Sequence, residues 1–206
     1  MRTTVRRGVT IVAAASLALT GTAIASTAAQ AAPPAIVHTA DATTTLPPYE
    51  TWIADVTAVT DTAKAYLSSR LPDKKIKAAI VLDIDNTALE STYHPYPYAP
   101  ATPPVLALAN QATAAGATVF FVTNRPDIIE LWTEGNLSSV GYQWGGLYMR
   151  PTFSTDAAET IKTNARIAIE GLGYTIVANV GNSDTDLVGG HAERTFKLPD
   201  YDGLLD

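Results

Sequence analysis

The stretch Ile76-Lys77-Ala78-Ala79-Ile80-Val81-Leu82-Asp83-Ile84-Asp85-Asn86-Thr87 decides the fold. Its first seven residues form a short apolar run, which is typical of a strand that is buried on both faces of a parallel sheet. Two acids, Asp83 and Asp85, follow that run directly. Because open parallel sheets bind ligands beyond the carboxyl ends of their strands, the two acids mark the predicted site.

Apolar runs alternate with helical patterns in the rest of the chain. We predict further strands at 119–122, 146–149 and 174–180, and helices from Tyr49 to Pro72, from Pro103 to Gly116, after Pro126, and from 157 to Gly173. After the first helix the order is β-α-β-α-β-α-β. This order predicts an α/β fold with three layers, in which helices cover both faces of a Rossmann-like parallel sheet.

The first 31 residues have the pattern of a secretory signal peptide. Arg2, Arg6 and Arg7 precede an apolar stretch that ends in Ala29-Gln30-Ala31, a small-x-small cleavage site. We predict cleavage near Ala31, a secreted mature protein and no membrane attachment after cleavage. The alternative is a retained membrane anchor, which the Ala- and Thr-rich composition and Gly21 disfavour.

The mature chain divides into a linker and one domain. Residues 32–48 contain two Pro-Pro pairs and a Thr run without any sustained period, which predicts a flexible linker. Residues 49–206 are sufficient for a single well-buried domain of ordinary size.

The composition excludes several kinds of chemistry. The chain has 14 Lys and Arg against 20 Asp and Glu, and removal of residues 1–31 leaves 11 basic residues, a formal charge of −9. A chain of this charge is not expected to bind nucleic acid. The absence of cysteine excludes disulfides and thiolate nucleophiles.

Polar clusters follow three predicted strands, at 83–87, 123–125 and 181–186. Two carboxylates that lie two residues apart after a buried strand are costly to hold together without a cation. A hard divalent ion with oxygen ligands fits this requirement, and we predict Mg²⁺, which also binds phosphate oxygens and water. The alternative is a solvated turn, which would not also account for Thr123 and Lys162.

In these motifs the chain resembles the haloacid dehalogenase (HAD) superfamily, and within it the secreted acid phosphatases of the plant-type and class B-like branch. The resemblance rests on Asp83-x-Asp85-x-Thr87, Thr123, Lys162 and the acidic loop 181–186, and covers roughly residues 76–200. It implies a HAD-like fold and phosphatase activity, since an acid at position 85 separates phosphatases from dehalogenases. Only about fifteen residues separate Thr87 from the next helix, so we expect a small flap in place of a large cap.

The resemblance also implies a role for each motif residue. Asp83 is the nucleophile that forms an aspartyl-phosphate, and Asp85 is the general acid and base. Thr123 and the amide of Asn124 bind phosphoryl oxygens. Lys162 supplies positive charge to the phosphate and to Asp83.

The acidic loop departs from the family pattern, because Asn182 stands where an aspartate is usual. We predict the metal ligands to be Asp83, the backbone carbonyl of Asp85, Asn182 and Asp186. An asparagine oxygen ligates magnesium without adding negative charge, so the affinity should fall unless Asp184 or Asp186 compensates. Accordingly, Asn182→Asp is predicted to tighten magnesium binding.

Three features have two interpretations each. Lys162 is either catalytic or an ordinary solvated lysine. Arg125 either binds substrate or caps the following helix. The segment Tyr93–Tyr98 is either surface packing or a flap, in which Tyr93 would bind substrate and tyrosine rings would stack on an aromatic or nucleoside leaving group.

The sequence therefore predicts a secreted, magnesium-dependent acid phosphatase that hydrolyses small phosphate monoesters, with nucleotides and aromatic phosphates among the candidate substrates. The first alternative is a catalytically weak phosphate-binding or storage-type secreted protein, which the asparagine at position 182 raises. The second alternative is a phosphotransferase, which would pass the phosphoryl group of the same intermediate to an alcohol.

Overall fold

One five-stranded parallel sheet organises the residues that the computed structural model describes, which are 45–73, 75–95 and 97–206. The strand order is β3-β2-β1-β4-β5. The strands are β1 (Ala78–Leu82), β2 (Thr118–Pro126), β3 (Gly146–Arg150), β4 (Thr175–Gly181) and β5 (Thr195–Lys197). Their pairings are all parallel. The predicted α/β fold is confirmed.

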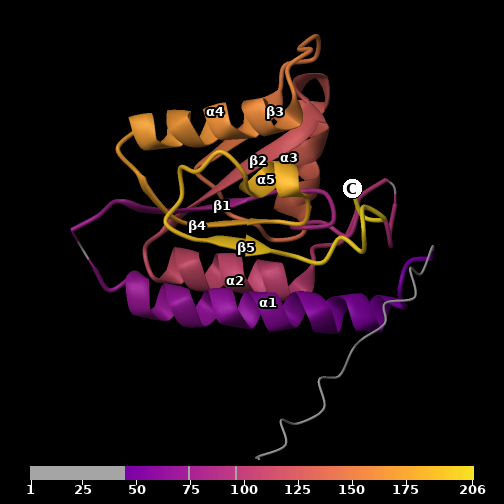
Figure 1. Cartoon of the computed structure of the whole chain (residues 1–206), viewed down its shortest axis with the longest axis horizontal. Coiled ribbons are helices and arrows are strands. Elements are labelled where there is room, and N and C mark those ends of the chain that lie inside the picture. The colour runs from indigo at the N-terminus through magenta and orange to yellow at the C-terminus, as the bar shows by residue number, and fades with distance from the viewer. Residues whose placement is uncertain (1–44, 74, 96) are drawn as a thin grey trace, which may run out of the picture. The chain divides into compact units, whose positions relative to one another are not determined.

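Helices cover both faces of this sheet (Figure 1). They are α1 (Tyr49–Arg70), α2 (Pro103–Ala114), α3 (Glu130–Ser139), α4 (Ala158–Gly171) and α5 (Asp184–Leu187), with a 3-10 turn, η1 (Asp127–Ile129), before α3. In the view of Figure 1, α1 and α2 run along the lower face and α4 runs along the upper face. The three layers that the sequence predicts are therefore present.

The buried residues of β1 alternate between the two faces, as the pleat of a strand requires. Ile80 and Leu82 join the larger hydrophobic cluster, which includes the buried faces of α1 and α2. Ala79 and Val81 join a smaller cluster with Ile169 of α4. Burial of each large aliphatic side chain contributes about 1.5–3 kcal/mol, so β1 is fixed from both sides.

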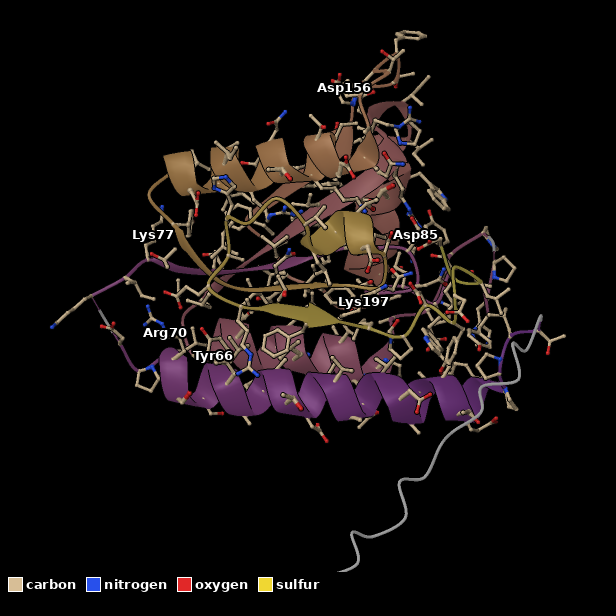
Figure 2. All side chains as sticks on the ribbon, viewed as in Figure 1. Tyr66, Arg70, Lys77, Asp85, Asp156 and Lys197 are labelled. Carbon is tan, nitrogen blue, oxygen red and sulfur yellow. The ribbon has the colours of Figure 1, made fainter. Side chains whose placement is uncertain are left out.

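The carboxyl ends of β1, β2 and β4 meet at one edge of the sheet. Leu82 at the end of β1 is in register with Phe121 of β2 and Val180 of β4. The backbone N–H of Asp83 continues this pairing by donating to the Val180 carbonyl at 3.0 Å. Figure 2 shows Lys77 and Asp85 at opposite ends of β1. The three polar clusters of the sequence are thus brought to a single edge.

The connection between β1 and α2 is short and irregular. Among its described residues, only isolated bridges link Asp85 with Leu89 and Leu89 with Ala101. This agrees with the expected absence of a large cap after Thr87.

Two parts of the sheet and its helices differ from the predictions. The short strand β5 and helix α5 were not predicted. Strand β5 has only three residues, of which Phe196 alone is buried, and α5 has only four residues. After Pro126, the chain forms the 3-10 turn η1 before helix α3 begins, and Ile128 and Leu131 are 75% and 86% exposed. Leu137, one turn and a half later, enters the core instead.

The predicted signal peptide (1–31) and residues 32–44 of the predicted linker lie outside the described residues. The last residues of that linker belong to the domain, because Leu46 packs against the larger core cluster. Within the described part of the chain, no helix combines the length and apolar character needed to span a bilayer.

Candidate active site

A polar cavity of about 520 Å³ opens at the edge where the three strands end. It is lined by residues from the loops after β1 and β4, from the carboxyl end of β2, from α4 and from the C-terminal segment. The lining includes Asp83, Asp85, Asn86, Ser91, Thr92, Thr123, Asn124, Arg125, Lys162, Asn182, Ser183, Thr185, Leu205 and Asp206. Most of the residues that the sequence predicts for the site are therefore brought together.

Asp83 lies at the end of β1 with only 6% of its surface exposed. Its Oδ1 accepts a hydrogen bond from the Lys162 Nζ at 3.0 Å. Burial raises the pKa of Asp83 to about 7, the nearby carboxylate of Asp186 adds to that rise, and the Lys162 ammonium opposes it. Burial thus favours the protonated form of Asp83, whereas a nearby cation favours its carboxylate.

Lys162 is buried on the inner face of α4 and reaches two carboxylates. Its Nζ contacts Oδ1 of Asp83 and Oδ1 of Asp186. Burial alone would lower the pKa of Lys162, but the two carboxylates together raise it. The interpretation of Lys162 as a solvated lysine is therefore wrong.

The backbone around Asp186 fixes its carboxylate toward Lys162. Asp186 Oδ2 accepts from the Ser183 N–H at 2.8 Å, within a capping box at the start of α5. Its carbonyl accepts from Asn179 Nδ2 at 2.8 Å and from Nη1 of the buried Arg166 at 2.7 Å. A Cβ at position 181 would overlap the Asp186 carboxyl, so glycine is required there.

Asp85 faces Arg125 at the mouth of the cavity. Arg125 donates from Nε to Oδ2 at 2.8 Å and from Nη2 to Oδ1 at 2.6 Å, and the Ser91 hydroxyl also donates to Oδ1 at 2.6 Å. Burial would raise the pKa of Asp85, but these contacts, led by Arg125, hold it below its ordinary value. Arg125 therefore pairs with the predicted general acid, and it does not act merely as a helix cap.

Thr123 is the last buried residue of β2, and Asn124 follows it within the same strand. Thr123 is 1% exposed, and its hydroxyl accepts from the Arg125 backbone N–H at 3.1 Å. Both residues line the cavity. The Arg125 guanidinium also lies 5.2 Å from the ring centroid of Trp132.

Asn182 is buried, and both ends of its side chain are occupied. Its Oδ1 accepts from the Thr87 hydroxyl at 3.0 Å, and its Nδ2 donates to the Leu205 carbonyl at 2.8 Å. Lys197 donates to its backbone carbonyl. The structure thus places Asn182 at the cavity but gives it structural partners that were not predicted.

Tyr93 does not line the cavity, in contrast to the prediction that it binds substrate. Its ring stacks on Trp52 of α1 at 4.7 Å, and its hydroxyl donates to the Pro47 carbonyl at 2.8 Å. Packing against a buried aromatic determines its position. Further along the segment, Tyr98 is half exposed and stacks on Trp132 at 6.2 Å.

Sequence reasoning gave no role to Ser91, Asn86, Arg166 or the C-terminal residues. Asn86 lies within the polar cluster at 83–87, and asparagine is one of the residue types that most often adopt the left-handed backbone conformation it has here, with φ 53°. The contact of Arg166 with the Asp186 carbonyl joins residues that lie 20 apart in the chain, so no local sequence pattern could predict it.

The charges of the buried acids bear on the magnesium ion that the sequence predicts. Asp83 and Asp186 are two buried carboxylates that share a single ammonium, so the site has a deficit of positive charge. The described residues contain no cluster of three or more His, Cys, Asp or Glu arranged to hold a metal. A magnesium ion would therefore also depend on amide and carbonyl oxygens, such as those of Asn182 and Asp85, and on water.

A family model matches a large part of this chain. Residues 97–204, more than half of the chain, match the family model described as HAD superfamily, subfamily IIIB (acid phosphatase). The matched span begins after Asp83 and Asp85.

Relatives with curated names come from plants. The stem 28 kDa glycoprotein of Glycine max is 38% identical over 106 residues, which cover 49% of this chain and 42% of that protein. Vegetative storage protein 1 of Arabidopsis thaliana is 31% identical over 101 residues, which cover 48% and 37%. The chain thus spans less than half the length of these relatives.

Among solved structures, the class C acid phosphatase from Bacillus anthracis has a similar fold. The TM-score is 0.59 at 18% identity, and the match covers 75% of this chain and 82% of that chain. The same enzyme with tungstate bound gives a TM-score of 0.57, with the same identity and coverage.

Proposed function

This chain belongs to the acid phosphatases of subfamily IIIB of the HAD superfamily, and from that premise we propose that it is a secreted, magnesium-dependent phosphomonoesterase with Asp83 as nucleophile. The observation that carries the proposal is the buried pair of Asp83 and Lys162 at 3.0 Å, at a polar cavity that Thr123 and Asp85 also line. A nucleophile needs a site that partly excludes bulk water and that holds positive charge to bind the phosphoryl group. Asp83 is buried, and the Lys162 ammonium supplies the positive charge.

In the first step, a carboxylate oxygen of Asp83 attacks phosphorus. The bond between phosphorus and the ester oxygen breaks, and an aspartyl-phosphate forms on Asp83. Asp85 donates a proton to the departing alcohol. Lys162, Thr123 and the Asn124 amide stabilise the negative charge on the phosphoryl oxygens.

In the second step, Asp85 acts as the base. It takes a proton from a water molecule that attacks phosphorus, the bond to the Asp83 oxygen breaks, and inorganic phosphate and a free carboxylate are released. Asp85 must carry a proton in the first step, which its pairing with Arg125 disfavours. We therefore include a movement of Arg125 from Asp85 to the phosphate dianion, for which its two-point donor geometry is suited.

Magnesium, when bound, would neutralise negative charge on the phosphoryl group. The residues that would hold it are Asp83, Asp186, Asn182 and the backbone carbonyl of Asp85. Secretion rests on the signal-peptide pattern of residues 1–31. The substrates we propose are small monoesters, since the described connection after β1 contains no cap domain.

A storage-type protein with weak catalysis is the second candidate function. It is favoured by the name of the Arabidopsis thaliana relative, vegetative storage protein 1, and by the asparagine at position 182. Both candidates retain the fold and differ in turnover.

Hydrolysis of a chromogenic phosphate monoester by the mature chain tests the proposal. We expect turnover that requires added magnesium, is abolished by a chelator and is lost in Asp83→Asn. Binding of inorganic phosphate without turnover would instead support the storage-type function. Product analysis with an added alcohol distinguishes hydrolysis from phosphotransfer.

A further inference from the structure

The last residues of the chain, 201–206, form a strap that returns to the site. Three consecutive residues, Tyr201, Asp202 and Gly203, have left-handed backbone conformations, with φ of 52°, 57° and 84°. They turn the chain so that the side chain of Leu205 enters the larger hydrophobic cluster with 1% exposure. The Tyr201 hydroxyl donates to Asp55 of α1 at 2.8 Å. Figure 1 shows this yellow segment beside the loop after β1.

Two buried asparagines hold the strap by a single atom. The Leu205 carbonyl accepts from Asn86 Nδ2 at 2.7 Å and from Asn182 Nδ2 at 2.8 Å. Asn86 follows β1 and Asn182 follows β4, so the carbonyl bridges the loop that carries the predicted nucleophile and the acidic loop. Their exposed fractions are 3% and 2%.

The opposite ends of both amides fix their orientation. Asn86 Oδ1 accepts from the Thr92 N–H at 2.9 Å, and Asn182 Oδ1 accepts from the Thr87 hydroxyl at 3.0 Å. Because the Leu205 carbonyl can only accept, both NH₂ groups must face it, and the Thr92 N–H, which can only donate, fixes Asn86 in the same orientation. A carboxylate at either position would instead place an acceptor against that carbonyl, with no proton between them.

The strap also borders the cavity, which Leu205 and Asp206 line together with Asn86 and Asn182. We propose that Asn86 and Asn182 clamp the Leu205 carbonyl and thereby make residues 201–206 a fixed wall of the active site, which limits the size of the ester that enters. The effect on ester size rests on the proposed phosphatase function, whereas the clamp itself does not. Position 182 then serves as an anchor for the strap.

Hydrogen exchange tests the clamp without any assay of activity. In Asn182→Asp, we expect amides of the 201–206 segment to exchange at least about tenfold faster than in the wild type, because the strap opens locally. Leu205→Ala removes the apolar anchor, leaves both asparagines intact, and should have the same effect. Asn110→Asp is the matched control, since it makes the same change of charge at an exposed position of α2.

The preference of the enzyme for large or small esters tests whether residues 201–206 limit the size of the substrate. We expect the ratio of kcat/KM for 1-naphthyl phosphate to that for glycerol 2-phosphate to rise at least about fivefold in Asn182→Asp and in Leu205→Ala, and to stay constant in Asn110→Asp. Agreement between the first two variants separates the strap from any effect of position 182 on magnesium. Should Asn182→Asp not fold, Leu205→Ala and Asn86→Asp carry the same test.

The outcomes test the clamp, the wall and the proposed phosphatase function separately. Protection of the 201–206 segment that is unchanged in the variants overturns the clamp. Faster exchange with an unchanged ratio of kcat/KM overturns the wall. If the wild type hydrolyses neither ester, the proposed phosphatase function fails, and the exchange rates still decide whether the clamp exists.

Discussion

Replacement of Lys162 by methionine measures how much the Lys162 ammonium stabilises the two buried acids of the site. The substitution keeps a long apolar side chain on α4 but removes the ammonium that lies 3.0 Å from Asp83 and also contacts Asp186. Breaking a buried ion pair by removing one partner costs about 3–5 kcal/mol, because a buried charge is left without compensation. For Lys162→Met we expect the free energy of unfolding to fall by about 3–5 kcal/mol at pH 8 in the presence of a chelator.

The loss should depend on pH in a defined direction. The pKa of Asp83 is about 7 in the folded protein and about 3.9 in an unfolded chain. At pH 5 the folded protein already holds a proton on Asp83, so loss of the ammonium costs less there. At pH 8 the folded variant must take up a proton or bury an unpaired charge, and each pH unit costs about 1.4 kcal/mol per proton. The destabilisation therefore grows from pH 5 to pH 8.

Urea denaturation at the two pH values measures this effect. Lys64→Met is the control, since Lys64 pairs with an exposed aspartate, Asp61, whose side chain is 64% exposed, and such surface pairs contribute little. For Lys162→Met we also expect kcat to fall by about 10²–10³. A destabilisation below about 1 kcal/mol at pH 8, or one that is equal at both pH values, would refute the role of Lys162 as the shared cation.

The remaining predictions concern groups near this pair. Gly181→Ala should destabilise the protein by about 1–3 kcal/mol and weaken magnesium binding, because its Cβ overlaps the Asp186 carboxyl. Gly171→Ala, at a site with open space around the new Cβ, should not lower the urea midpoint. Arg125→Lys loses the two-point contact with the general acid and should lower kcat/KM about 10–100-fold with little change in the urea midpoint; an unchanged kcat/KM would remove Arg125 from the reaction. Calorimetric titration with magnesium at pH 6 should release protons, since Asp83 has a pKa of about 7 and ligates a cation only when ionised. Binding heats that are the same in buffers of different ionisation enthalpy would contradict this.

The sheet and the position of the site followed from local pattern. The apolar run before Asp83 predicted β1, and the rule that ligands bind beyond the carboxyl ends of parallel strands placed Thr123 beside Asp83. The short strand β5 could not be predicted from the pattern of apolar residues, because its three residues form a strand only through pairing with β4.

The partners of side chains were less predictable, because distant residues determine them. Periodicity could not decide whether Lys162 is solvated, since its carboxylate partners lie 79 and 24 residues away in the chain. Tyr93 belongs to an aromatic, proline-rich segment that is compatible with a flap, but Trp52 provides a buried surface on which it stacks. The amide contacts of Asn182 with Leu205 were equally invisible, since an asparagine in a loop has many potential partners.

Detection of the covalent intermediate tests the central claim most directly. The mature protein should be mixed with magnesium and a phosphate monoester, quenched in acid within the first turnover, and digested for peptide mass spectrometry. We predict a phosphoryl group on Asp83 that disappears as turnover completes and is absent from Asp83→Asn. Hydrolysis that proceeds without phosphorylation of Asp83, or that persists in Asp83→Asn, would contradict the account.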